Sequence, residues 1–300
     1  MSTLNIDVKK FSEPCACGKE HTIFVKDILV EAGALQKLPS ILSGEAYGKF
    51  RNPVVICDEN TYRAAGRDVL KLLPQASCVC LNPLGLHADE CGVSAVEDQL
   101  PPDTDLLLSV GAGTIHDITR YCAKEKNIPF VSVPTAASVD GFVSTVAAMT
   151  WHGFKKTTPA VSPICVVADS SVFSKAPYRL TASGISDLLG KFTALADWRI
   201  AHIVTGEYFC ERVYELELEA VHEVCSVLQD IRDGGITACE KLMYALLLSG
   251  IAMQMVGNSR PASGAEHHLS HLWEMEAVNP HTDAYHGIGI CDSQKRFRPR

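Results

Sequence analysis

The second half of the chain carries histidines at spacings that suit metal binding, and an acid that lies four residues before a lysine. Asp187 lies in the run Gly-Ile-Ser-Asp-Leu-Leu-Gly-Lys over residues 184–191, and His267, His271 and His286 follow further along the chain. A spacing of four residues places His267 and His271 on one face of a helix. Imidazole groups clustered among apolar helices can coordinate a divalent metal, whereas a lone histidine is more often structural. Asp187 and Lys191, four residues apart, are typical of a surface ion pair, an interpretation that their apolar flanks weaken.

A glycine-containing segment near the middle of the chain has the features of a phosphate-binding loop. Residues 111–117 read Gly-Ala-Gly-Thr-Ile-His-Asp, after an apolar run and before a helical pattern. The free N–H groups and the dipole at a helix N-terminus bind pyrophosphate, and glycine permits close approach. The segment matches neither G-x-G-x-x-G nor G-x-x-x-x-G-K-[ST]. It predicts phosphate binding, with a plain tight turn as the alternative.

Hydroxyl and carboxylate side chains follow the next apolar run. Residues 134–141 read Pro-Thr-Ala-Ala-Ser-Val-Asp-Gly. If both runs are parallel strands, this segment and the glycine-containing segment leave the sheet at the same edge, where open α/β sheets bind ligands. Ser, Thr and Asp also populate loops for local hydrogen bonding, so this segment alone specifies no ligand.

Two tight cysteine pairs raise the question of a further metal site. Cys15, Cys17 and His21 offer zinc-binding groups, but C-x-C is tighter than the usual C-x₂₋₄-C spacing and no fourth ligand is apparent nearby. The spacing therefore disfavours zinc at these residues. Cys78 and Cys80 lie in an apolar run, and we expect both thiols to be buried in a strand.

The elements that must position these residues differ between the two halves. Short apolar runs alternate with helical patterns in the first half, which is typical of a parallel sheet flanked by helices. The expected strands are residues 53–57, 77–81, 105–110, 130–133 and 164–168. Longer periodic segments then predict helices over 183–205, 211–232 and 239–256. We expect an α/β nucleotide-binding domain over residues 1–177 and a helical domain that binds metal and substrate over residues 178–300.

Composition narrows the class of protein further. The 300 residues are 47% hydrophobic and 21% charged, and they carry a formal net charge of -8, the wrong sign for a nucleic-acid-binding protein. There is no apolar leader and no run of roughly 18 uninterrupted apolar residues, so we expect neither secretion nor membrane insertion. Most of the 12 cysteines are expected to be reduced thiols of a cytoplasmic protein.

Four blocks in this order resemble the sn-glycerol-1-phosphate dehydrogenase family, in its bacterial branch associated with arabinose operons. This family belongs to the dehydroquinate synthase and iron-containing alcohol dehydrogenase superfamily. The blocks are residues 111–117, 134–144, 184–191 and 259–271. The resemblance implies an α/β fold in which an N-terminal Rossmann-like parallel-sheet domain precedes an all-α, dehydroquinate synthase-like domain. Family members continue beyond the His-Gly pair at 286–287, so a chain that ends at Arg300 is expected to be truncated, with the helical domain incomplete.

The resemblance also implies which residues bind the cofactor, NAD(H) or NADP(H). They come from the glycine-containing segment, from the segment after the fourth strand, and from the end of the first strand. These residues are Gly113, Thr114, Ile115, His116, Asp117, Thr135, Ala136, Ala137, Ser138, Ser144 and Asp58. An acid at Asp58 near the ribose would repel a 2′-phosphate and so favours NADH.

Metal and substrate residues are implied in the same way. Asp187, His267 and His286 match the ligands of one divalent metal, for which we expect zinc, with nickel or iron as alternatives. One Asp and two His leave coordination positions open, as a catalytic metal requires. Asp140, Asp187 and His271 match the residues that contact the substrate, and these are the expected catalytic residues.

The reaction implied by the resemblance is the reversible, metal-dependent reduction of dihydroxyacetone phosphate to sn-glycerol 1-phosphate, which would feed glycerophospholipid synthesis. One alternative is glycerol dehydrogenase or another polyol dehydrogenase of the same superfamily. Another is an inactive truncated chain that binds nucleotide or metal without turnover. We expect a homodimer in the full-length form, with no nucleic-acid or membrane partner.

Overall fold

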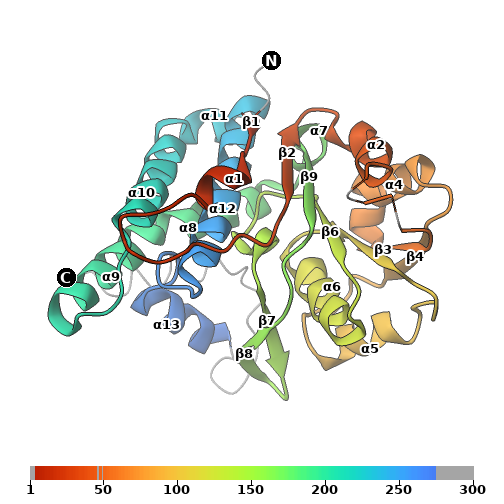
Figure 1. Cartoon of the computed structure of the whole chain (residues 1–300). Helices are drawn as coiled ribbons and strands as arrows, with labels where there is room; N and C mark the ends of the chain where they lie inside the picture. Colours follow the sequence, from red (N-terminus) through yellow and green to blue (C-terminus); the bar gives the residue numbers. More distant parts are fainter. Residues whose placement is uncertain (1–3, 46, 49, 275–300) are drawn as a thin grey trace.

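The computed structural model describes residues 4–45, 47–48 and 50–274, and it places a parallel sheet beside a set of helices (Figure 1). The sheet has seven strands in the order β1-β2-β9-β6-β5-β3-β4, and only β1 runs antiparallel to its neighbour. The strands are β1 (Leu4–Asn5), β2 (Asp27–Glu31), β3 (Pro53–Asp58), β4 (Ser77–Leu81), β5 (Leu106–Gly111), β6 (Phe130–Pro134) and β9 (Cys165–Asp169). The expected α/β fold with a parallel sheet is confirmed, and so are the five predicted strands.

Helices cover both faces of this sheet, which explains why β5, β6 and β9 are mostly apolar and are buried along their whole lengths. On one face α2 and α4 share a core with alternate strand residues such as Val55 and Leu108. On the other face α5 and α6 pack against the intervening residues, such as Ile56 and Leu107. The helices of this part are α1 (Val8–Phe11), η1 (Ala34–Lys37), α2 (Leu38–Leu42), α3 (Glu59–Thr61), η2 (Tyr62–Gly66), α4 (Arg67–Leu72), α5 (Glu90–Glu97), α6 (Gly113–Lys126), η3 (Gly141–Val143) and α7 (Ser170–Phe173).

The strand order reverses between β3 and β5. The chain leaves β3 for β4 on one side, whereas it leaves β5 for β6 on the other. Ligands of open α/β sheets bind at such a reversal, outside the carboxyl ends of the strands. The topology therefore predicts a ligand-binding site at the carboxyl ends of β3, β5 and β6.

The chain after residue 177 is helical as far as residue 274, where the described residues end. Its helices are α8 (Tyr178–Leu189), α9 (Lys191–Thr205), α10 (Glu211–Ser226), α11 (Leu228–Arg232), α12 (Ile236–Val256) and α13 (Ala265–Glu274). Their apolar core continues into the sheet through Val30 and Val166. The predicted domain boundary at residues 177/178 stays a prediction.

Helix α12 is the central helix of this second part. Its 21 residues are long and apolar enough to cross a membrane, but 67% of its most apolar window is buried inside the protein. A helix that is apolar on all sides is expected at the centre of a core. Its burial therefore accounts for its sequence.

Several local expectations differ from the structure. The helix expected over 183–205 is interrupted at Gly190, and the helix expected over 211–232 is interrupted at Val227. Strands β7 (Val146–Trp151) and β8 (Phe154–Pro159) form a separate hairpin that the sequence reasoning missed. The prediction that Cys78 and Cys80 are core thiols is wrong, because β4 is an edge strand that leaves Cys80 exposed and Cys78 half-buried.

Candidate active site

The glycine-containing segment forms the first turn of α6, directly after β5. Ala112 is the extended N-cap residue, and the 14 residues from Gly113 onward are helical. Gly113, Thr114 and Asp117 are half-buried at this end. The N–H groups of a first helical turn have no partner within their own helix, so this end of α6 can accept an anionic group.

Two residues predicted to bind the cofactor point their side chains into the protein. Ile115 packs in the core beneath α6. The Nε2 of His116 lies 2.7 Å from the Ser132 hydroxyl, and its Nδ1 lies 3.0 Å from the carbonyl oxygen of Ala112. Burial and, to a smaller extent, the charge of Arg120 lower the pKa of His116 to about 3, so the ring is neutral. Ile115 and His116 can therefore serve a cofactor only through their main-chain groups.

The segment after β6, here called the exit loop (residues 135–144), lies beside the start of α6. The N–H of Thr135 donates to the carbonyl of Gly111 over 3.0 Å. Ala136, Ala137 and Ser138 are buried, and within the described residues the Ser138 hydroxyl has no hydrogen-bond partner. Burying a hydroxyl without a hydrogen bond costs free energy. The Ser138 hydroxyl is therefore suited to bind a polar group of a ligand.

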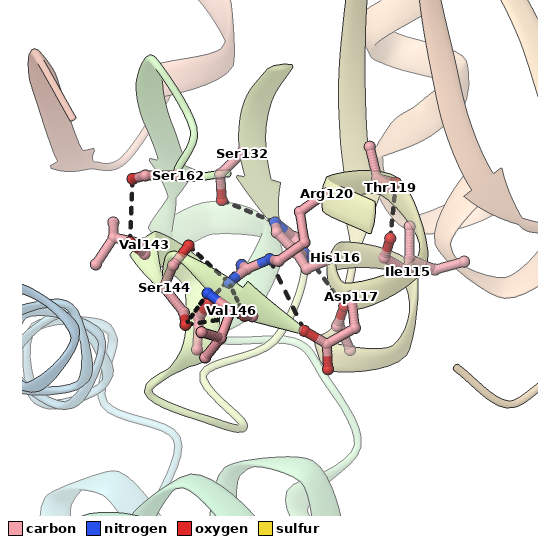
Figure 2. A network of polar contacts seen from close by, with 12 residues as sticks. Ile115, His116, Asp117, Thr119, Arg120, Ser132, Val143, Ser144, Val146 and Ser162 are labelled. Atoms are coloured by element: carbon pink, nitrogen blue, oxygen red, sulfur yellow. Dashed lines mark hydrogen bonds and ion pairs between the residues drawn. The ribbon is translucent and has the colours of Figure 1, made fainter. Parts of the chain in front are cut away.

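A buried arginine fixes the exit loop to α6. Figure 2 shows Arg120 reaching from α6 to the main chain around Ser144. It donates to the carbonyl oxygens of Ser144 at 3.0 Å and Val146 at 3.1 Å, and also to that of Gly141. Asp117 lies 3.8 Å from its Nε. Because charged hydrogen bonds are strong where water is excluded, Arg120 holds two predicted cofactor-binding segments in one arrangement.

Asp58 lies at the same edge of the sheet. It is the last residue of β3, which pairs in parallel with β5, whose last residue is Gly111. Its Oδ1 caps α3 by accepting from the N–H groups of Asn60 at 2.7 Å and Thr61 at 2.8 Å. The carboxylate therefore has a structural role, and its predicted ribose contact stays a prediction.

Two glycines let helices of the second part reach the exit loop. A side chain at Gly184 of α8 would collide with the carbonyl of Ala137. A Cβ at Gly250 of α12 would lie 2.8 Å from the carbonyl oxygen of Asp140. Only glycine allows main chains to approach so closely. The two contacts place the predicted residues Asp140 and Asp187 side by side.

A buried ion-pair network is built at this junction. The ammonium of Lys191 lies 2.8 Å from Asp140 Oδ2 and 2.9 Å from Asp187 Oδ1. The other oxygen of Asp187 accepts the N–H of Asp140 at 3.0 Å, and the hydroxyl of Ser249 donates to Asp140 over 3.0 Å. Lys191 and Asp187 are fully buried. The structure therefore brings together two predicted catalytic carboxylates and adds a cation between them.

Burial and charge act in opposite directions on this network. Burial and the neighbouring Asp187 raise the pKa of Asp140, whereas Lys191 lowers it. Burial alone would lower the pKa of Lys191, but the carboxylates of Asp140 and Asp187 raise it overall. Glu217 of α10 lies nearby, and burial raises its pKa to about 8 against the attraction of Lys191, so it is mainly protonated at neutral pH.

The predicted histidines lie on α13, which packs against α9. The N–H of Ala265 donates to Asp197 of α9 over 2.8 Å, and the rings of His267 and His271 are 4.9 Å apart between centroids. His267 is buried, as Asp187 is. A carboxylate and an imidazole are donors that suit a divalent metal. The third predicted ligand, His286, lies outside the described residues.

Three residues of the site were missed by sequence reasoning: Arg120, Glu217 and Ser249. The pairing of Lys191 with Asp187 was apparent from their spacing, and the structure shows that this pair is buried and not on the surface. Glu217 lies among helical residues of mixed polarity and gives no such signal.

Comparison with a family model and with solved structures defines the fold class of this protein. The family model for iron-containing alcohol dehydrogenase matches residues 29–177. The structure resembles the glycerol dehydrogenase of Schizosaccharomyces pombe with a TM-score of 0.74 and 19% identity, over 94% of this chain and 74% of that one. It also resembles the sulfoacetaldehyde reductase of Bifidobacterium kashiwanohense, solved with NAD+, with a TM-score of 0.71 and 15% identity, over 93% and 75% of the two chains. The fold is that of the iron-containing alcohol dehydrogenases.

Sequence relatives are more specific. The glycerol-1-phosphate dehydrogenase [NAD(P)+] of Bacillus licheniformis is 40% identical in an alignment that covers 97% of this chain and 74% of the relative. The enzyme of the same name from Methanosarcina barkeri is 33% identical, over 87% and 72% of the two chains. The chain belongs to the family of glycerol-1-phosphate dehydrogenases, and the predicted resemblance is confirmed.

Proposed function

We propose that this chain catalyses the reversible, NAD(P)H-linked reduction of dihydroxyacetone phosphate to sn-glycerol 1-phosphate. The observation that carries the proposal is the buried network of Asp140, Lys191 and Asp187, which lies where the exit loop meets the helical part. The network lies beside the start of α6, so its buried charged side chains are next to the place where a dinucleotide would bind. Family membership supports both the cofactor and the substrate.

The cofactor site would be formed by the start of α6 and the exit loop. Gly113 and Thr114 would contribute main-chain N–H groups to the pyrophosphate, as the first turn of a helix does. Thr135 and Ser138 would contribute hydroxyls, and the Ser138 hydroxyl is buried without a hydrogen-bond partner among the described residues. NAD(P)H would supply the hydride.

The metal and substrate site would be formed by the helical part. Asp187, His267 and His286 would hold one divalent ion, zinc by expectation, which supplies a Lewis acid for the substrate oxygen. Lys191 and the N–H of Asp140 each bind one oxygen of Asp187, so the orientation of its carboxylate is fixed. Asp140 and His271 would contact the substrate.

The proposed compartment and oligomeric state are based on composition and on family membership. We assign the enzyme to the cytoplasm, as a homodimer, with its product directed to phospholipid synthesis.

Activity with defined substrates tests the proposal. The purified chain is given dihydroxyacetone phosphate, NADH or NADPH, and zinc, nickel or ferrous ion in turn, and cofactor oxidation is followed by absorbance. We expect turnover, and we expect the product to resist an enzyme specific for sn-glycerol 3-phosphate. Oxidation of glycerol by NAD+ without activity on the phosphate would instead identify a polyol dehydrogenase. NADH binding without turnover under any metal would contradict the proposal for this chain.

A matched pair of variants locates the activity. Asp140→Asn should lower kcat by at least about tenfold, because it removes a charge from the buried network. Asp68→Asn is the control, since Asp68 is exposed on α4 and pairs only with neighbouring surface residues. Equal activity of the two variants would refute the assignment of the site.

A further inference from the structure

A second cluster of metal-ligating side chains lies outside the candidate active site. Cys15, Cys17 and His21 belong to the segment between α1 and β2, and Cys210 directly precedes α10. One ligand atom from each of these four residues lies within 4.8 Å of all the others. Cys210 is the fourth ligand that the sequence did not reveal, because it is 195 residues from Cys15.

The distances within this cluster match those of a tetrahedral metal site. The Sγ atoms of Cys15 and Cys210 are 3.6 Å apart, and His21 Nε2 is 3.5 Å from Cys17 Sγ and 3.6 Å from Cys210 Sγ. Around zinc, with bonds of about 2.3 Å to sulfur and about 2.0–2.1 Å to nitrogen, tetrahedral ligands lie about 3.8 Å apart for two sulfurs and about 3.5 Å for sulfur and nitrogen. These three distances therefore match those of a tetrahedral site, and all four ligand atoms lie within 4.8 Å of one another.

The orientation of His21 also suits a metal ligand. Its Nδ1 lies 2.7 Å from the main-chain carbonyl of Met255, at the end of α12. A carbonyl oxygen can only accept, so Nδ1 carries the proton and Nε2 presents its lone pair to the sulfur atoms. Metal-binding histidines are commonly held in this way. His21 and Cys210 are buried, which keeps water from these ligand atoms.

The local backbone explains how the C-x-C spacing of Cys15 and Cys17 can place both sulfur atoms at one metal site. The N–H of Gly18 donates to the carbonyl of Cys15 over 3.1 Å, and Gly18 has a φ of 76°. This turn in the left-handed region, which favours glycine, brings Cys15 and Cys17 together. The hydroxyl of Tyr208 donates to Cys17 Sγ over 3.3 Å, which stabilises negative charge on that sulfur.

We propose that Cys15, Cys17, His21 and Cys210 bind one zinc ion. Three thiolates and one imidazole form a closed tetrahedral set with no position left for substrate, so this ion is structural. On binding, the thiols release their protons and the ion takes their place between the sulfur atoms. It would tie the N-terminal segment, which crosses the helical part in Figure 1, to α10 and α12.

A disulfide between Cys15 and Cys210 is the competing use of these thiols. It would require the two sulfur atoms to move from 3.6 Å to about 2.05 Å. It would also leave the Nε2 of His21 and the sulfur of Cys17 in close contact without a common partner. The cation accounts for all four side chains, whereas the disulfide accounts for two.

Cobalt substitution and metal analysis of the whole chain test the proposal. Cobalt bound by thiolates gives an intense sulfur-to-metal charge-transfer absorption. The proposed catalytic ligands Asp187, His267 and His286 contain no sulfur, so this band reports the cysteine site alone. We expect the reduced wild-type chain to show the band and to lose it when one equivalent of zinc is added. Reduced protein without the band, or protein isolated two hydrogen atoms lighter with a Cys15–Cys210 bond, would overturn the proposal.

Variants assign the ligands. Cys17→Ser and Cys210→Ser should each lose one equivalent of bound zinc and the cobalt band, whereas Cys91→Ser should keep both, because Cys91 is exposed on α5 away from the cluster. If a variant does not fold, alkylation of the wild type decides instead. Cys15 and Cys17 should react at least about tenfold faster after chelation of the metal. Equal rates before and after chelation would contradict the proposal.

Discussion

Replacement of Lys191 by methionine tests the electrostatic reasoning most directly. The ammonium is fully buried and lies 2.8 Å from Asp140 and 2.9 Å from Asp187. Removing one partner of a buried ion pair costs about 3–5 kcal/mol, because the remaining charge is left uncompensated. We therefore expect Lys191→Met to lower the free energy of unfolding by about 3–5 kcal/mol and the melting temperature by about 10 °C.

Urea denaturation followed by circular dichroism measures this loss. Lys124→Met is the matched control, since Lys124 forms an exposed pair with Glu125, and such pairs contribute about 0–1 kcal/mol. Adding Asp140→Asn to Lys191→Met removes one of the uncompensated charges, so the double variant should recover about 1–3 kcal/mol relative to the sum of the single variants. A loss below about 1 kcal/mol for Lys191→Met, or additive single variants, would refute the reasoning.

Three further predictions follow from other parts of the site. The pKa of His116 is about 3 in the folded protein and 6.5 as its reference value, so the unfolded chain binds the extra proton between these values. In urea denaturation the wild type should therefore lose about 2 kcal/mol more stability from pH 7 to pH 5 than His116→Gln, which keeps the opposing contribution of Glu217. Gly184→Ala should cost about 1–3 kcal/mol because its methyl meets the Ala137 carbonyl. Gly141→Ala, whose methyl would only reach van der Waals contact with Val139 at 4.0 Å, should change stability by under about 0.5 kcal/mol in the same assay. If Asp58 faces the ribose, Asp58→Asn should raise the ratio of kcat/KM for NADPH over NADH about tenfold, and an unchanged ratio would remove Asp58 from the cofactor site.

The central strands could be predicted because burial on both faces leaves a simple signal. Strands β3, β5 and β6 are continuous apolar runs with helical patterns between them, and each was found close to its expected bounds. Strand β1 escaped prediction because it has only two residues at the sheet edge. Strand β2, which lies between β1 and β9, has a mixed sequence that alternates between buried and more exposed residues over only five positions.

The site was predictable in its residue types but not in its connections. Asp140 and Asp187 could be named from sequence patterns and family resemblance, yet their contact depends on Gly184 and Gly250, which act only through tertiary packing. Cys210 was missed for the same reason, since no local spacing relates it to residues 15–21. Pairings between distant segments arise from the fold and leave no periodic trace in the sequence.

The contact between His21 and Met255 has a consequence for the order of folding during synthesis. The two residues are 234 positions apart, so a ribosome adding about 5–20 residues per second needs roughly 12–47 s to bring the second after the first. During that time β3, β4, β5 and β6 can already pair, whereas β2 must wait for β9, and the cysteines at 15 and 17 must wait for residue 210. The beginning of the chain is thus among the last parts to reach its final place, and its position at the edge of the sheet is what makes so late an arrival possible.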